Sequence, residues 1–188
     1  HLKGIAGAKM TFETMAGPVS AEVKGRVVKV LMPRPTGFLR DVDLEQSEGW
    51  ESVDFINPGV PHVVVGVQNL SEHPVVDQGR TIRYHTLFAP EGTNANFVKA
   101  TGPHQMEIRT YERGVEDETL ACGTGNVAAA LILAHERGLT SPVTLTTRSG
   151  GNLTVHFSTQ GGRYQDVFLE GDARVIYRGD LWEEAWRP

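Results

Sequence analysis

Apolar and polar residues alternate over short stretches in the first third of the chain. Alternation sends successive side chains to opposite faces of an extended backbone, which is typical of a half-buried β-strand. Gly17-Pro18 and Gly25 separate the stretches, and these residue types favour turns. We therefore expect an antiparallel meander with strands over residues 10–14, 19–23 and 27–32.

Prolines and a glycine end this pattern after residue 32, and the polar segment 41–50 predicts a loop and a domain boundary. Alternation or short apolar runs then return. Further strands are expected over residues 53–56, 62–67, 95–100, 105–112, 143–147, 153–157, 166–170 and 173–177. Many short strands and few helices predict an α/β fold of the α+β kind, in which a sheet curls around the helices.

Two helices are expected. The segment 123–136 has the clearest signals, because Gly138 and Pro142 follow it as a helix stop. A second helix is expected over residues 75–84, with Ser71 as a candidate N-cap.

Composition narrows the class of protein. The chain has 188 residues, a net charge of −5 and a hydrophobic share of 39%, which fit an ordinary globular enzyme or binding domain. Basic and acidic residues are mixed, so the sequence argues against a nucleic-acid partner. We find no apolar run of membrane-spanning length, no secretory signal pattern and a single cysteine that excludes an internal disulfide. A cytoplasmic location without a membrane partner is the expectation.

That single cysteine, Cys122, precedes a Gly-Thr-Gly turn and an alanine-rich segment. The unpaired amides and dipole at a helix N-terminus favour a thiolate and bind anions. Cys122 is therefore a candidate acid or base. The alternative is a small buried cysteine that fills a gap in the core.

An acid and a base precede the cysteine turn. Glu112 and Arg113 end a predicted strand that leads by one loop to Cys122, so we expect them close in space. A carboxylate could accept the thiol proton, and a guanidinium could bind a substrate carboxylate with two hydrogen bonds. The competing interpretation is an exposed surface pair. His62 and Asn94 lie at strand starts, where structural roles are the commoner ones.

Several segments together resemble the diaminopimelate epimerase family, cofactor-independent isomerases of lysine and cell-wall precursor synthesis. The most specific is the cysteine segment from Glu118 to Gly125, with Glu112-Arg113-Gly114 before it. The resemblance extends over residues 8–179 in the family's order. Its other segments are 59–64, 84–88, 92–98 and 169–175.

The resemblance implies two similar halves, each with a curled, mostly antiparallel sheet around a central helix, and a pocket between them. One thiol in each half would act on opposite faces of the substrate Cα, without a metal or pyridoxal phosphate. It implies one complete half plus part of the other: residues 1–45, 46–178 and a tail, 179–188, returning toward the N-terminal half. A homodimer is also implied.

Site roles follow from the same resemblance, residue by residue. Cys122, Glu112 and His62 would be catalytic, with His62 supporting the opposite thiol. Substrate would be held by Asn94, Glu112, Arg113, Gly123 and Thr124.

Departures from the family pattern are also visible. The opposing cysteine, its glycine-asparagine turn and the first strands are expected upstream of His1. Val60 stands where many relatives have an asparagine at the distal end of the substrate. Asn126 and Val127 follow the glycines at positions where relatives often have small residues or a second cysteine.

Three other interpretations remain open. Gly123 to Ala128 fits the outline of a dinucleotide-binding turn, but a polar loop precedes it where a buried strand should lie. Proline, hydroxyproline or histidine epimerases and phenazine-pathway isomerases share the implied fold. A non-catalytic fragment is the third possibility.

Overall fold

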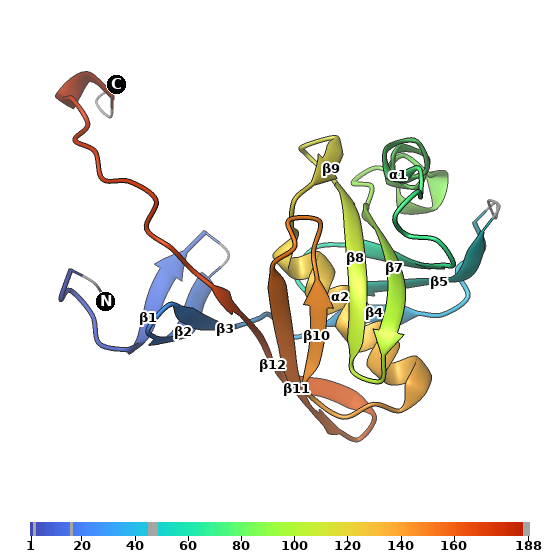
Figure 1. The fold of residues 1–188 in the computed structure, drawn as a ribbon, viewed down its shortest axis with the longest axis horizontal. Helices are drawn as coiled ribbons and strands as arrows, with labels where there is room; N and C mark the ends of the chain where they lie inside the picture. The colour runs from blue at the N-terminus through green and yellow to red at the C-terminus, as the bar shows by residue number, and fades with distance from the viewer. Residues whose placement is uncertain (2, 16, 45–48, 186–188) are drawn as a thin grey trace.

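The computed structural model describes residues 1, 3–15, 17–44 and 49–185, and it arranges them as one mixed sheet with two α-helices (Figure 1). In the described residues the sheet has twelve strands, in the order β1-β2-β3-β12-β11-β10-β8-β7-β6-β5-β4, with β9 paired to β8. The strands are β1 (Lys9–Thr14), β2 (Gly17–Lys24), β3 (Val27–Leu31), β4 (Thr36–Leu39), β5 (Trp50–Asn57), β6 (His62–Val67), β7 (Asn94–Gly102), β8 (Gln105–Glu112), β9 (Asp117–Thr119), β10 (Val143–Thr146), β11 (Asn152–Gln160) and β12 (Arg163–Asp172).

Most strand pairs are antiparallel, as expected. The parallel pairs are β6 with β7 and β8 with β10. A parallel pair needs a crossover connection, and the two helices provide them: α1 (Val75–Arg83) lies between β6 and β7, and α2 (Gly123–Arg137) lies between β8 and β10. Short 3₁₀ turns occupy Thr86–Phe88 and Glu183–Ala185.

The helix α2 is the centre of the core. Its residues from Gly125 to Ala134 are all buried, and it contacts β5, β6, β7, β8, β10, β11 and β12. Small alanines on most faces let the sheet curl closely around the helix. Gly138 ends α2 with a left-handed φ of 63°, which confirms the predicted stop.

A second apolar cluster lies on the other face of the sheet, under α1. It includes Val63, Phe97 and Tyr111 from the central strands and Val75 and Ile82 from the helix. The expected Ser71 cap is wrong: α1 begins after Pro74 and has no side-chain cap, because proline fixes the entry of the first turn. No helix in the described part of the chain has the length and apolar character of a membrane span.

Strands β1 to β3 form a separate blade that joins the rest of the sheet through the pairing of β3 with β12 (Figure 1). β4 pairs with β5, so residues 36–39 belong to the main part of the sheet. The predicted division after residue 45 stays a prediction.

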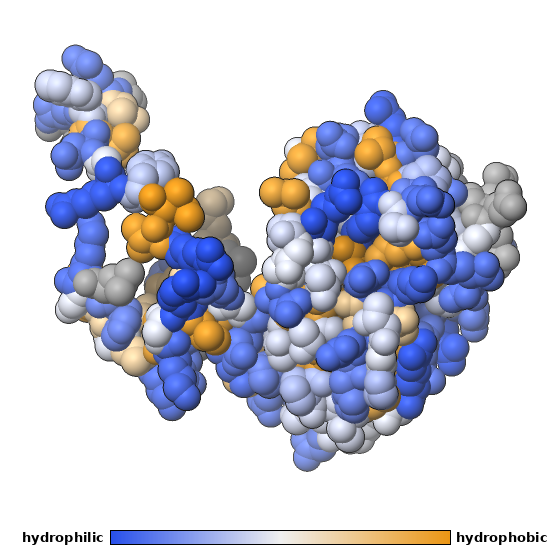
Figure 2. All heavy atoms as spheres, viewed as in Figure 1, coloured by the Kyte–Doolittle hydropathy of each residue, from blue (hydrophilic) through white to orange (hydrophobic). Residues whose placement is uncertain are grey.

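The strand expected over residues 173–177 is wrong. This segment is extended but pairs with no described strand, and Val175, Ile176 and Tyr177 are 70–85% exposed. Alternation gave the pattern of a strand, but a strand also needs a neighbour to accept its backbone hydrogen bonds. Figure 2 shows apolar side chains gathered on the side of the molecule formed by this tail and β1 to β3.

Candidate active site

Cys122 caps the N-terminus of α2 with extended backbone angles, φ −124° and ψ 112°. Its side chain is 7% exposed, and Sγ lies 3.6 Å from the hydroxyl oxygen of Thr124. The Cys122 carbonyl accepts hydrogen bonds from the backbone and side-chain amides of Asn126, at 3.0 and 2.7 Å. The thiol is therefore held rigidly at the predicted helix start.

The pKa of Cys122 is shifted in the opposite direction from the one expected from the sequence, where the helix N-terminus was expected to favour the thiolate. Burial raises the pKa of the thiol above its usual value, and the negative charge of Glu112 adds to this. Hydrogen bonds from Thr124 and the Gly125 amide act in the opposite direction but are the smaller effect. The helix terminus does favour the thiolate, but removal from water outweighs it, so the thiol is protonated in this structure.

Glu112 lies at the end of β8, as predicted, and its charge acts on Cys122. Its carboxylate accepts a hydrogen bond from the Thr119 hydroxyl at 2.9 Å, which fixes the carboxylate beside the approach to α2. Glu118, which also precedes the cysteine, instead pairs with Arg109 at 2.7 Å. The structure thus brings Glu112 to the thiol and turns Glu118 to another partner.

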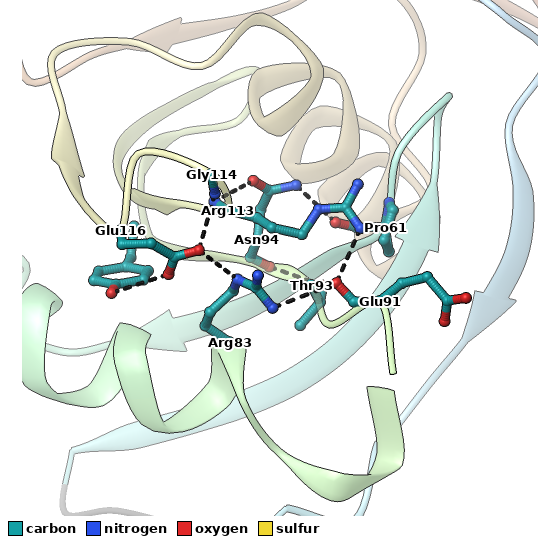
Figure 3. A network of polar contacts seen from close by, with 9 residues as sticks. Pro61, Arg83, Glu91, Thr93, Asn94, Arg113, Gly114 and Glu116 are labelled. Carbon is teal, nitrogen blue, oxygen red and sulfur yellow. Dashed lines mark hydrogen bonds and ion pairs between the residues drawn. The ribbon is translucent and has the colours of Figure 1, made fainter. Parts of the chain in front are cut away.

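Asn94 joins the loops around the site (Figure 3). Its amide donates to the Pro61 carbonyl at 2.9 Å, and its Oδ1 accepts from the backbone N–H of Arg113 at 2.9 Å. The start of β6 is thereby tied to the turn after β8. A direct bond from Asn94 to substrate stays a prediction, since both ends of its amide already have backbone partners.

A polar frame that the sequence analysis missed holds Arg113 (Figure 3). The guanidinium groups of Arg113 and Arg83 both donate to the Glu91 carbonyl, at 3.1 and 3.3 Å. Arg83 also pairs with Glu116 at 3.0 Å, and Glu116 accepts from the Gly114 amide. No local sequence signal marks this frame, because the turn at Glu116, with a φ of 61°, is visible only in the folded chain.

His62 lies at the start of β6, opposite Asn94 in the parallel register, and is fully buried. Its Nε2 is 2.9 Å from the Thr124 hydroxyl, and its Nδ1 is 3.0 Å from the amide nitrogen of Asn96. Burial lowers the pKa of His62 to about 3, and the nearby charge of Arg113 acts in the same direction. The ring is therefore neutral and linked through Thr124 to Cys122; support of an opposing thiol stays a prediction.

Comparison with known proteins decides the family. The sequence model for diaminopimelate epimerase matches residues 55–176. The curated diaminopimelate epimerase of Aquifex aeolicus is 46% identical over 189 residues, covering 97% of this chain and 65% of the relative. The chain belongs to the diaminopimelate epimerase family. The diaminopimelate epimerase of Chlorobaculum tepidum is 40% identical, covering 96% of this chain and 69% of the relative. The chain thus spans about two thirds of the length of these relatives.

Solved structures confirm the epimerase-type fold. A probable proline racemase from Agrobacterium radiobacter has a TM-score of 0.68 at 16% identity, covering 98% of this chain and 64% of that one. A phenazine biosynthesis protein of the PhzF family from Bacillus anthracis also has a TM-score of 0.68, at 15% identity, covering 89% and 66%. At these identities the likeness establishes the fold and leaves the substrate undecided.

The titration of His62 gives a test of the buried site. Its pKa is lowered from 6.5 to about 3, so the unfolded chain binds more protons between these values. His62 therefore contributes stability that is complete above pH 6.5 and is lost as the pH falls toward 3. We expect His62→Gln to flatten the fall in unfolding free energy over this range, by up to about 1.4 kcal/mol per pH unit.

Chemical denaturation between pH 3.5 and 7 measures this slope. His104→Gln is the control, because His104 is exposed in the turn before β8. An equal slope in wild type and His62→Gln would contradict a neutral, buried His62.

Gly125, in the first turn of α2, gives a second test of how tightly the site is packed. A Cβ at this position would lie 2.4 Å from Asn96 Oδ1 and 3.3 Å from Cys122 Cβ. Helix propensity alone favours Gly125→Ala by about 1 kcal/mol. Overpacking against the buried, hydrogen-bonded Asn96 opposes this, and such clashes cost about 1–3 kcal/mol. We expect net destabilisation and displacement of the site.

Denaturant unfolding checks the Gly125→Ala result. Gly102→Ala is the matched control, since its Cβ would meet only the flexible Gln105 side chain, at 3.4 Å or more. A Gly125→Ala protein as stable as wild type would show that Asn96 is free to move.

Proposed function

We propose that this chain provides one acid–base half of a cofactor-independent epimerase that acts at the Cα of diaminopimelate. Cys122 would exchange a proton with one face of Cα, and Glu112 would be its partner. The observation that carries the proposal is the convergence of three features at one end of α2: a buried thiol, backbone amides of the first helical turn that act on its sulfur, and a carboxylate whose charge acts on it. The identities of 46% and 40% to proteins named diaminopimelate epimerase favour this substrate.

Each step of the proposed chemistry has a group to perform it. Loss of the Cα proton places negative charge on the substrate carboxylate, which the amides of Gly123 and Thr124 at the helix N-terminus would stabilise. Arg113 donates one guanidinium N–H to the Glu91 carbonyl, so its remaining N–H donors can bind a carboxylate. The polar frame of Arg83, Glu91 and Glu116 would keep that guanidinium in place.

The protonation state of Cys122 is compatible with this role. A thiol with a raised pKa is a proton donor before substrate binds, and inversion requires a donor on one face and an acceptor on the other. The sequence holds a single cysteine, so inversion would need a second acid–base group that acts from the opposite face. Lysine and cell-wall precursor synthesis, a cytoplasmic location and a homodimer belong to this proposal.

Deuterium exchange at Cα tests the function. The purified chain is incubated in D₂O with meso- and LL-diaminopimelate, and deuterium and stereochemistry are followed by mass spectrometry and chiral chromatography. Exchange with inversion would mean that acid–base groups act on both faces of Cα. Exchange without inversion would mean that Cys122 acts on one face alone. No exchange by a folded protein would contradict the proposal for this chain.

Proline, hydroxyproline and histidine are the substrate controls, because a proline racemase and a hydroxyproline epimerase share this fold at 16–19% identity. Deuterium exchange at the Cα of proline, without exchange of diaminopimelate, would show that the substrate is proline and would contradict the proposed substrate. Val60 is the residue whose replacement we expect to alter the preference for the distal end of the substrate.

A further inference from the structure

We propose that Asn96 is a positioning residue that fixes the tautomer of His62 and so directs the Thr124 hydroxyl proton toward the sulfur of Cys122. The role of this arrangement in catalysis rests on the proposed function. The hydrogen bonds themselves are independent of it. Asn96 lies on β7, two residues beyond Asn94, and is fully buried.

The orientation of the Asn96 amide is determined by its neighbours. The Val63 carbonyl lies 2.8 Å from Asn96 Nδ2, and a carbonyl can only accept, so this atom must be the NH₂ group. The Thr110 hydroxyl donates to Oδ1 on the other side, at 3.0 Å. A flipped amide would place two oxygens against each other at Val63. The second N–H of Asn96 therefore points to His62 Nδ1, 3.0 Å away.

The proton positions of His62 and Thr124 follow from this. Because His62 is neutral, as its lowered pKa requires, and its Nδ1 accepts from Asn96, its proton must be on Nε2. Nε2–H then donates to the Thr124 oxygen at 2.9 Å. The Thr124 oxygen accepts from His62 and still carries its own hydrogen, which the proposal assigns to Cys122 Sγ, 3.6 Å away.

Close packing keeps this chain of hydrogen bonds in place. The missing Cβ of Gly125 is what allows Asn96 Oδ1 to approach the first turn of α2. The charge that acts on the sulfur is that of Glu112, which raises the pKa of the thiol, whereas the charge of Arg113 acts on His62. The hydroxyl of Thr124 is thus a neutral donor that favours the thiolate within an environment that otherwise opposes it.

The first experiment observes the tautomer directly. Two-dimensional ¹⁵N NMR of histidine side chains at pH 7 distinguishes a protonated Nε2 from a protonated Nδ1, and the His62→Gln spectrum assigns the His62 signals. We expect the Nε2–H form in the wild-type protein. An Nδ1–H form or a charged ring would overturn the proposal.

The second experiment measures the thiol. Cys122 is the only cysteine in the sequence, so the pH dependence of iodoacetamide alkylation reports on it alone. Loss of one hydrogen bond to the thiolate in Thr124→Val is expected to raise its pKa and slow alkylation below that pKa about tenfold. Thr124→Ser, which keeps the hydroxyl, should retain the wild-type profile.

Asn96→Leu completes a double-mutant cycle. It should change alkylation in the same direction as Thr124→Val, and it should add nothing in the Thr124→Val background, because Asn96 acts through Thr124. An equal effect of Asn96→Leu in both backgrounds would overturn the proposal. If Asn96→Leu does not fold, the wild-type tautomer and the comparison of Thr124→Val with Thr124→Ser still decide it. Neither readout uses a substrate, so these results stand apart from the exchange assay.

Discussion

Replacing Cys122 with alanine is expected to reduce deuterium exchange at the Cα of diaminopimelate by about 10²–10⁴-fold, the usual contribution of a positioned acid or base. The sequence holds no second cysteine to substitute for it. The small alanine side chain fits the same N-cap position, and Asn126 would still bind the carbonyl of residue 122. The fold should therefore survive, and thermal unfolding measured in parallel checks that it does.

Cys122→Ser is the matched control for chemistry. Serine keeps the size and a hydrogen-bonding group beside Thr124, but its hydroxyl ionises far less readily than a thiol. We expect the serine variant to lose exchange almost as fully as the alanine variant. Exchange near the wild-type rate in either variant would show that Cys122 is a packing residue, the alternative that its burial allows.

Replacing Leu131 with alanine is expected to lower the free energy of unfolding by about 2–5 kcal/mol, the range for large-to-small changes in a core. Leu131 is fully buried at the middle of α2, among the alanines around which the sheet curls. It belongs to the apolar cluster in which α2 packs against the sheet, so its truncation leaves a cavity inside that cluster. Chemical denaturation measures the loss.

Leu120→Ala is the control, because Leu120 lies two residues before the cysteine and is 68% exposed. Its removal should change stability by less than about 0.5 kcal/mol. A small effect of Leu131→Ala would mean that α2 can shift within the sheet, and the position of the thiol at its N-terminus would then be less rigid than inferred here.

Local signals predicted the regular elements well. The α2 boundaries follow from a glycine turn before the helix and Gly138 after it, and both depend on neighbouring residues alone. Strands such as β6 and β8 are predicted because their side chains alternate or are uniformly apolar. β4 reads Thr-Gly-Phe-Leu and follows two prolines, so it shows no alternation, and β9 has only three residues; both were missed.

The candidate site was predicted in part. Cys122 and Glu112 lie in one segment, and the loop that joins them brings the carboxylate near enough for its charge to act on the thiol. The Cys122 pKa was expected to be lowered but is raised, because burial of the thiol depends on how α2 packs against the sheet and cannot be seen in the local sequence. The roles of Arg83 and Glu116 were missed for the same reason, since these residues are 33 positions apart.

The sequence by itself determined which residues can carry acid–base chemistry, where the helix that presents the thiol begins and ends, and the family to which the chain belongs. The tertiary structure alone decided which proton each group holds. Asn96 and His62 meet because β6 and β7 are parallel neighbours in one register, and Thr124 reaches His62 because α2 lies under that pair. Such contacts depend on strand order and burial, and neither property is local in the chain.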